Sequence, residues 1–153
     1  MQAYIAMGSN LGDGEANIRQ ALAALEKQGV HIVKTSTLIR TAPYGVLDQP
    51  DFVNGVCEIA TDLSPLELLH TMLQLELDMG RVRKRRWGER NIDLDLLLYE
   101  DQVLELPDLK LPHPDMQNRS FVLEPLAEIA PDVIHPIFHK TIRELLGELS
   151  CKK

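Results

Sequence analysis

The hydrophobic and polar positions of the chain change period repeatedly, and each change marks the start of a new element. Short runs of apolar and β-branched residues predict strands, whereas apolar residues spaced three and four positions apart predict amphipathic helices. We therefore expect strands over 4–7, 30–40, 52–61 and 92–99, with a short additional strand over 103–106. We also expect a helix that begins at Glu15 and is ended by Gly29, and further helices over 64–80, 121–129 and 141–149.

Two of these helices have a clear start signal in the sequence. Ser64 with Glu67, and Thr141 with Glu144, have the spacing of a capping box. In that motif a hydroxyl and a carboxylate side chain each bind a backbone N–H group at the start of the helix. Pro65 suits the first turn, where its missing N–H group has no helical partner to lose.

The order of the main elements is strand, helix, strand, strand, helix, strand, which is typical of a split βαβ, ferredoxin-like α+β sandwich. We expect one domain over 1–153, since this length favours a single core. The sheet should be antiparallel, with helices on one side and mobile loops over the other, active-site face. Fold alone leaves the function open, because this superfold has many activities.

Composition excludes several classes of protein. The chain has 153 residues and a formal net charge of −7, which argues against a protein that coats nucleic acids. No apolar run approaches the length of a membrane-spanning helix, and the first residues lack the basic flank and apolar core of a signal peptide. Two cysteines, Cys57 and Cys151, indicate neither a disulfide framework nor a zinc site. We therefore expect a reduced, cytoplasmic protein with no membrane partner.

Positive charge is concentrated in one segment between the second long helix and the last main strand. Six basic residues lie within ten positions, against one acid, Glu89; they are Arg81, Arg83, Lys84, Arg85, Arg86 and Arg90. Like charges at this density repel one another. We expect this loop to be open and mobile until a polyanion draws the arginines inward.

Two aspartates, Asp93 and Asp95, follow the basic segment directly. On a strand both carboxylates lie on one face, about 7 Å apart along the backbone. Arg and Asp clusters this close could form surface salt bridges, which would stabilise the fold little. They are also what an Mg²⁺–polyphosphate site needs, namely oxygen ligands for the metal and guanidinium groups for the phosphates.

Two other segments have weaker signals. His113 lies on a connector stiffened by Pro112 and Pro114, close to Arg119; the pair could bind phosphate oxygens or belong to a solvated loop. The turn over 8–13 lacks the Gly-Lys-Ser/Thr ending of a P-loop, so by itself it indicates a tight strand-to-helix turn. No nucleophile motif is visible.

Taken together, these segments resemble 6-hydroxymethyl-7,8-dihydropterin pyrophosphokinases of folate biosynthesis over nearly the whole chain. The similarity lies in several long motifs in order. They are Gly8-Ser-Asn-Leu-Gly12, Arg40-Thr-Ala-Pro-Tyr-Gly45, Gln49-Pro-Asp-Phe-Val-Asn54, Gly80-Arg-Val-Arg83, Arg86-Trp-Gly-Glu-Arg90, Ile92-Asp-Leu-Asp95 and Pro112-His-Pro-Asp-Met-Gln-Asn-Arg119.

The resemblance implies transfer of diphosphate from ATP to the hydroxymethyl group of the pterin, leaving AMP. It implies that Asp93 and Asp95 hold two Mg²⁺ ions, and that Arg81 and Arg90 stabilise charge on the transferred group. The implied ATP site comprises Glu76, Arg83, Trp87, Leu96, His113 and Arg119. The implied pterin site comprises Thr41, Pro43, Tyr44, Gly45, Phe52, Asn54 and Phe121, with the two phenylalanines on either side of the flat heterocycle.

A second function class remains open at this stage. A ferredoxin-like module could bind nucleic acid with Arg81–Arg90 as a basic arm. Such a module needs exposed aromatics on its strands for base stacking, and few aromatics, Phe52 and Tyr99 among them, lie near strand positions. We expect small-molecule substrates, no nucleic-acid partner and a monomer.

Overall fold

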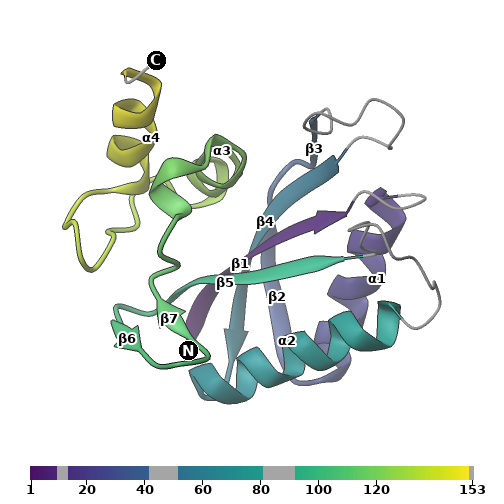
Figure 1. Ribbon diagram of the computed structural model, residues 1–153. Helices are drawn as coiled ribbons and strands as arrows, with labels where there is room; N and C mark the ends of the chain where they lie inside the picture. The colour runs from purple at the N-terminus through teal and green to yellow at the C-terminus, as the bar shows by residue number, and fades with distance from the viewer. Residues whose placement is uncertain (10–13, 42–51, 81–91, 152–153) are drawn as a thin grey trace.

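The computed structural model describes residues 1–9, 14–41, 52–80 and 92–151, and its centre is an antiparallel sheet (Figure 1). The strands are β1 (Gln2–Ser9), β2 (Val30–Thr35), β3 (Ile39–Thr41), β4 (Phe52–Thr61) and β5 (Asp93–Tyr99). Their order in the sheet is β2-β4-β1-β5, and β3 also pairs with β4. This is the strand order of a split βαβ fold, so the predicted fold class is confirmed.

Two helices cover one face of the sheet. α1 (Gly14–Lys27) connects β1 to β2, and α2 (Pro65–Gly80) connects β4 to β5. Their apolar stripes pack against the side chains of one face; Ile18 and Leu25 of α1 and Leu68 and Met72 of α2 are almost completely buried there. Burying such side chains is the main source of stability for a domain of this size.

The other face, where we expected loops, carries helices as well. α3 (Ser120–Ile129) and α4 (Ile142–Cys151) lie across the sheet from α1 and α2, next to a 3-10 turn over Met116–Asn118 (Figure 1). Val122 and Leu126 of α3 form a second core with Tyr4 and Val56 of the sheet. The sequence order of a split βαβ unit ends at β5, and therefore says nothing about where a C-terminal extension packs.

The predicted strand over 30–40 is also wrong, because it is two strands with a break over 36–38. The buried Ser36 hydroxyl accepts a hydrogen bond from the Val56 N–H (2.9 Å) and donates one to the Thr37 carbonyl (3.0 Å). Thr37 in turn donates from its N–H and its hydroxyl to the Glu128 carboxylate on α3. Serine and threonine side chains compete with the strand ladder in this way.

Several local predictions are confirmed. Each capping box forms: Glu67 N donates to the Ser64 hydroxyl (3.2 Å), and Glu144 N donates to the Thr141 hydroxyl (3.1 Å). The short strand near 103–106 is β6 (Leu104–Glu105), which pairs with β7 (Lys110–Leu111) in a separate small sheet. No helix in the described part of the chain is long and apolar enough to cross a membrane. The predicted mobile loop over 81–90 lies outside the described residues.

A buried histidine, His135, stabilises the turn between α3 and α4. His135 is 2% exposed, and its Nδ1 accepts hydrogen bonds from the N–H groups of Ile137 and Phe138, both at 3.2 Å. Its ring stacks on Phe138 with 4.5 Å between centroids. Burial lowers the pKa of His135 below its ordinary value of 6.5, and the neighbouring His139 lowers it further. The turn therefore requires the neutral ring.

We predict that the fold loses stability as the pH falls below 6.5, because a protonated Nδ1 cannot accept these two bonds. The pKa of His135 is lower in the folded than in the unfolded chain. Its contribution to the free energy of unfolding is therefore complete at pH values above the pKa of the unfolded chain, and it is lost on acidification. Replacing His135 by Asn keeps an acceptor at the same position without a titrating group. Urea unfolding of His135→Asn across this pH range should show a flatter profile than wild type, by roughly 1 kcal/mol. His139→Asn is the matched control and should keep most of the pH dependence of the unfolding free energy. Equal pH dependence in wild type and His135→Asn would contradict this role of His135.

Candidate active site

Two carboxylates lie together on β5, facing away from α1 and α2. Asp93 is half-buried and Asp95 is exposed. Leu94, which lies between them, and Leu96, which follows Asp95, point into the core. The N–H group of Leu94 donates to the Glu76 carboxylate on α2 at 2.7 Å. Because Leu94 separates the two aspartates, this bond from α2 fixes the backbone that carries them.

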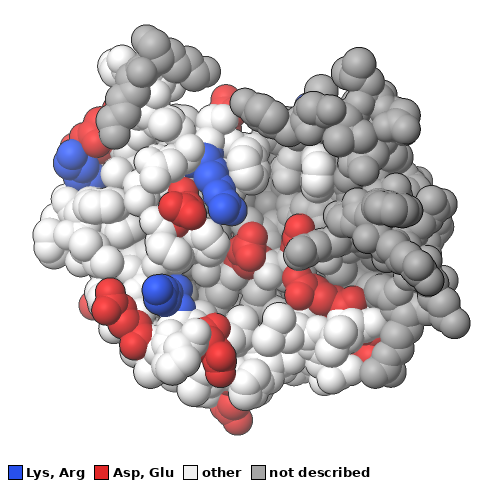
Figure 2. All heavy atoms as spheres, viewed as in Figure 1, with Lys and Arg blue, Asp and Glu red and all other residues white. Residues whose placement is uncertain are grey.

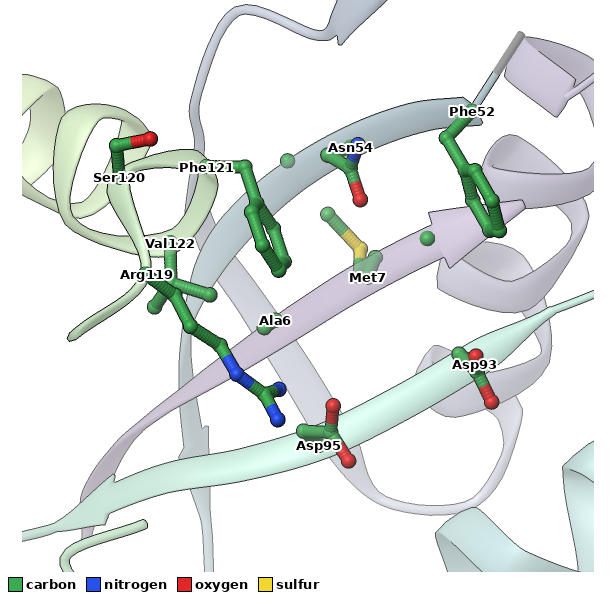
Figure 3. A pocket seen from close by; sticks show the side chains of 12 residues that line it. Ala6, Met7, Phe52, Asn54, Asp93, Asp95, Arg119, Ser120, Phe121 and Val122 are labelled. Atoms are coloured by element: carbon green, nitrogen blue, oxygen red, sulfur yellow. The ribbon is translucent and has the colours of Figure 1, made fainter. Parts of the chain in front are cut away.

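A cavity of about 550 Å³ opens on this face between α3 and the ends of β1, β4 and β5. Its lining includes Phe52 and Asn54 of β4, Phe121 of α3, and both Asp93 and Asp95. In Figure 3 the rings of Phe52 and Phe121 point into the cavity from opposite sides, with the Asn54 amide between them. The two aromatic rings and one amide leave a slot suited to a flat, polar-edged heterocycle.

A second cavity, of about 460 Å³, lies on the other side of the same two aspartates. It is bounded by α2, by β5 and by the small β6–β7 sheet with the connector that follows it. Its lining residues are Leu69, Leu73, Glu76, Asp93, Leu94, Asp95, Leu96, Pro107, Asp108, Leu109, Lys110, His113 and Pro114. Asp93 and Asp95 therefore belong to both cavities, and a ligand in each would meet at the carboxylates.

His113 is held at the edge of the second cavity by backbone bonds. Its N–H donates to the Leu97 carbonyl (2.9 Å), which ties the connector to β5. Its Nδ1 accepts from the Asp115 N–H at 3.2 Å, so Nε2 is the ring's donor. Burial lowers the pKa of His113 below 6.5, while the Asp95 carboxylate acts in the opposite direction. The ring is therefore neutral at pH 7 and can donate a hydrogen bond without adding charge.

Arg119 provides a positive charge at the start of α3. One of its terminal nitrogens lies 3.8 Å from the Asp115 carboxylate, and its guanidinium lies 5.9 Å from the centre of the Phe121 ring. In Figure 3 the side chain points toward Asp95. A cation near an aromatic face and an exposed ion pair are each weak interactions, so the guanidinium can move to a stronger anion.

The donor set at the carboxylates suits a hard cation. Figure 2 shows acidic side chains gathered near the centre of this face, with basic ones beside them. Among the described residues, no three His, Cys, Asp or Glu side chains come together as a closed metal cage. Mg²⁺ does not need one, because it commonly binds one or two carboxylates and completes its shell with water and substrate phosphates. Asp93 and Asp95 fit that pattern.

The structure brings together the described part of the predicted site. Glu76, Leu96 and His113 of the predicted ATP set line the second cavity, while Arg119 of the same set lines the first. Thr41 ends β3, and its backbone pairs with Phe52. The remaining predicted residues lie outside the described part of the chain: Arg81, Arg83, Trp87, Arg90, Pro43, Tyr44 and Gly45.

Some cavity residues were given no role by sequence reasoning. Leu69 has the spacing of an ordinary helix residue, and Asp108 and Lys110 belong to the turn and the second strand of the small β6–β7 sheet. Asp108 and Lys110 reach the second cavity because this small sheet packs against β5, and no local pattern in the sequence predicts that contact.

Comparison with known proteins gives a consistent result. The family model "7,8-dihydro-6-hydroxymethylpterin-pyrophosphokinase (HPPK)" matches residues 4–131. A 2-amino-4-hydroxy-6-hydroxymethyldihydropteridine pyrophosphokinase of Haemophilus influenzae is 48% identical over 99% of this chain and 94% of its own length. The folic acid synthesis protein fol1 of Schizosaccharomyces pombe is 44% identical over 96% of this chain, which spans only 20% of that longer protein.

Solved structures agree in fold. A Plasmodium falciparum HPPK-DHPS structure with pteroate superposes with a TM-score of 0.81 at 16% identity; the match covers 99% of this chain and 44% of that one. At this identity the likeness shows the fold alone. The family model and the Haemophilus relative cover most of the chain, and the chain belongs to the 7,8-dihydro-6-hydroxymethylpterin-pyrophosphokinase family.

Proposed function

We propose that the two cavities are the two substrate sites of the family's reaction, with the pterin in the first and ATP in the second. The chain transfers diphosphate from ATP to the hydroxymethyl group of 6-hydroxymethyl-7,8-dihydropterin in folate biosynthesis, giving the pterin diphosphate and AMP. One observation carries the assignment of sites: Asp93 and Asp95 line both cavities, so donor and acceptor would meet at the same carboxylates.

The first cavity supplies the contacts that a pterin needs. Phe52 and Phe121 would contact the two faces of the ring, and Asn54 would bind its amide edge. Burial between aromatic rings favours a flat heterocycle, while a single amide sets its orientation. We assign Thr41, Pro43, Tyr44 and Gly45 to backbone contacts around the same ring.

The second cavity suits a nucleotide. Leu96 and its apolar neighbours offer a surface for the base, and His113 would donate from Nε2 to a phosphate oxygen. Arg119 lies in the first cavity near Asp95, where a polyphosphate chain passing between the cavities would reach it. Glu76 supports the site through the Leu94 backbone. We assign Arg83 and Trp87 to the same substrate.

The transfer needs positioning and charge neutralisation more than covalent chemistry. Asp93 and Asp95 would hold the Mg²⁺ that accompanies ATP, which we propose to be two ions. When bound, the metal neutralises the phosphates and lowers the pKa of an attacking hydroxyl. Arg81 and Arg90 would stabilise charge on the transferred group. We further propose a cytoplasmic monomer.

The alternative of a nucleic-acid-binding module is not supported, because the matching relatives are named as pyrophosphokinases. One of the two strand aromatics considered for base stacking is also inaccessible. Tyr99 is fully buried, with its hydroxyl donating to the Leu63 carbonyl, so it cannot stack on a base.

Incubation of the protein with ATP, Mg²⁺ and 6-hydroxymethyl-7,8-dihydropterin tests the activity directly. Chromatography should show AMP and the pterin diphosphate forming in equal amounts, with neither formed when the pterin is omitted. Formation of ADP in place of AMP would contradict diphosphate transfer.

Asp93→Asn and Asp95→Asn should each reduce turnover at least about a hundredfold while the protein stays folded, because each removes a charged metal ligand. Thermal unfolding should be unchanged or slightly higher, since one of two neighbouring like charges is gone. Asp101→Asn, an exposed aspartate in the turn after β5, is the matched control and should turn over normally. Near-normal AMP production by either active-site variant would refute the metal assignment.

Phe52→Ala and Phe121→Ala should each weaken pterin binding about tenfold and leave ATP binding nearly unchanged, because each removes one aromatic face of the slot. Calorimetric titration with pterin and with a non-hydrolysable Mg–ATP analogue separates the two affinities. The third phenylalanine, Phe138, lies in the turn between α3 and α4, so Phe138→Ala serves as the control with both affinities retained. An equal loss of ATP affinity in Phe52→Ala and Phe121→Ala would contradict the assignment of the two rings to the pterin site.

A further inference from the structure

Gly8 occupies the middle of a row of three residues that crosses the floor of the first cavity. On β1 it is paired with Asn54 of β4 on one side and with Asp93 of β5 on the other. Directly paired residues of neighbouring strands project their side chains to the same face. The row therefore presents an amide, then bare backbone, then a carboxylate, and all three residues line the cavity. With strands about 4.8 Å apart, its two ends are roughly 10 Å from each other.

The backbone at Gly8 does not itself require glycine. Among the described glycines, Gly29 is the one with a positive φ, at 84°. What a side chain at position 8 would meet is the Asn54 amide: a Cβ placed there lies 3.0 Å from Asn54 Oδ1. This is closer than about nine in ten of the contacts that real Cβ atoms make, so the amide would have to shift by a few tenths of an ångström. Asn54 is only 9% exposed, which leaves it little room to do so.

We infer that Gly8 is a positioning residue for the acceptor substrate, acting through Asn54, an inference that rests on the proposed function. The missing Cβ lets the Asn54 amide lie across the cavity floor, where it can meet the edge of the pterin. Side chains that bind substrate polar groups must be placed to within about 0.5 Å. A single methyl group at position 8 therefore displaces the pterin and not ATP.

Two other glycines offer informative comparisons. Gly55 also lines the cavity, but a Cβ there would meet Leu38 Cδ2 at 2.6 Å and the Ser36 hydroxyl at 3.3 Å. Gly55→Ala therefore disturbs packing at the β2–β3 break and does not isolate the site. Gly147 lies in α4 with nothing within 4 Å of an added Cβ. Gly147→Ala is the matched control, because it adds the same methyl group and favours the helix.

The test compares wild type, Gly8→Ala and Gly147→Ala. For Gly8→Ala we expect the Kd and KM of the pterin to rise about tenfold, the cost of one misplaced methylene-sized group in a binding site. The KM of ATP and the kcat at saturating pterin should stay within about twofold, as expected when binding common to ground and transition states is lost. Gly147→Ala should match wild type in all four quantities. An unchanged pterin Kd in Gly8→Ala, or an equal rise in the KM of ATP, would overturn the inference.

A double-mutant cycle separates positioning from general damage to the fold. In an Asn54→Ser background the amide is gone, so Gly8→Ala should change the pterin Kd by less than about twofold, a strong departure from additivity. The same tenfold loss in both backgrounds would show that Gly8 does not act through Asn54, and would overturn the inference. Formation of AMP by the wild type tests the proposed function separately, because the cycle uses only ratios of pterin affinity between variants.

Discussion

The backbone hydrogen bonds that join β1 to β4 and to β5 fix the spacing between the parts of the site. In this register Gly8 lies between Asn54 and Asp93, so the side chain proposed to orient the acceptor and the one proposed to hold the metal are two strands apart. A slip of one residue in either pairing would turn the slipped strand's member of this row to the other face, into the core under α1 and α2. The core on that face therefore also protects the geometry of the site.

The two faces of the sheet are covered to different extents, and the site occupies the part that remains open. On the face under α3 and α4, the half that contains Tyr4 and Val56 is packed against these helices. The other half ends in Gly8, Asn54 and Asp93, and the first cavity forms where α3 begins. The Glu128 carboxylate on α3 accepts hydrogen bonds from Thr37, which ties this helix to the turn before β3. The position of Phe121 thus depends on contacts at both ends of α3.

The regular parts of this arrangement could be predicted from sequence because their causes are local. Apolar spacing gave the helices and main strands, and the capping boxes form as expected. The break after β2 could not be predicted, because β-branched residues continue through it and the cause is a buried Ser36 hydroxyl bonded to a distant strand. The placement of α3 and α4, and of Lys110 beside the second cavity, follows from tertiary packing without a periodic signal. The spacing of two residues between Asp93 and Asp95 was enough to predict that both lie on one face of the strand. Gly8, in contrast, resembled a turn residue, because its strand partners Asn54 and Asp93 cannot be read from the local sequence.

Electrostatics explains why the proposed chemistry is confined to one place on this molecule. The chain has a net charge of −7, so its surface as a whole repels a polyphosphate. The two carboxylates at the meeting point of the cavities add to that repulsion, and His113 does not relieve it, because burial keeps its ring neutral at pH 7. Attraction must come from the metal and from arginines: Arg119 at the start of α3 and the basic residues concentrated between 81 and 90. A triphosphate without its cation would meet the two negatively charged carboxylates directly. Preference for the Mg²⁺-bound nucleotide over the free one would follow from the same pair of side chains to which we assign the metal.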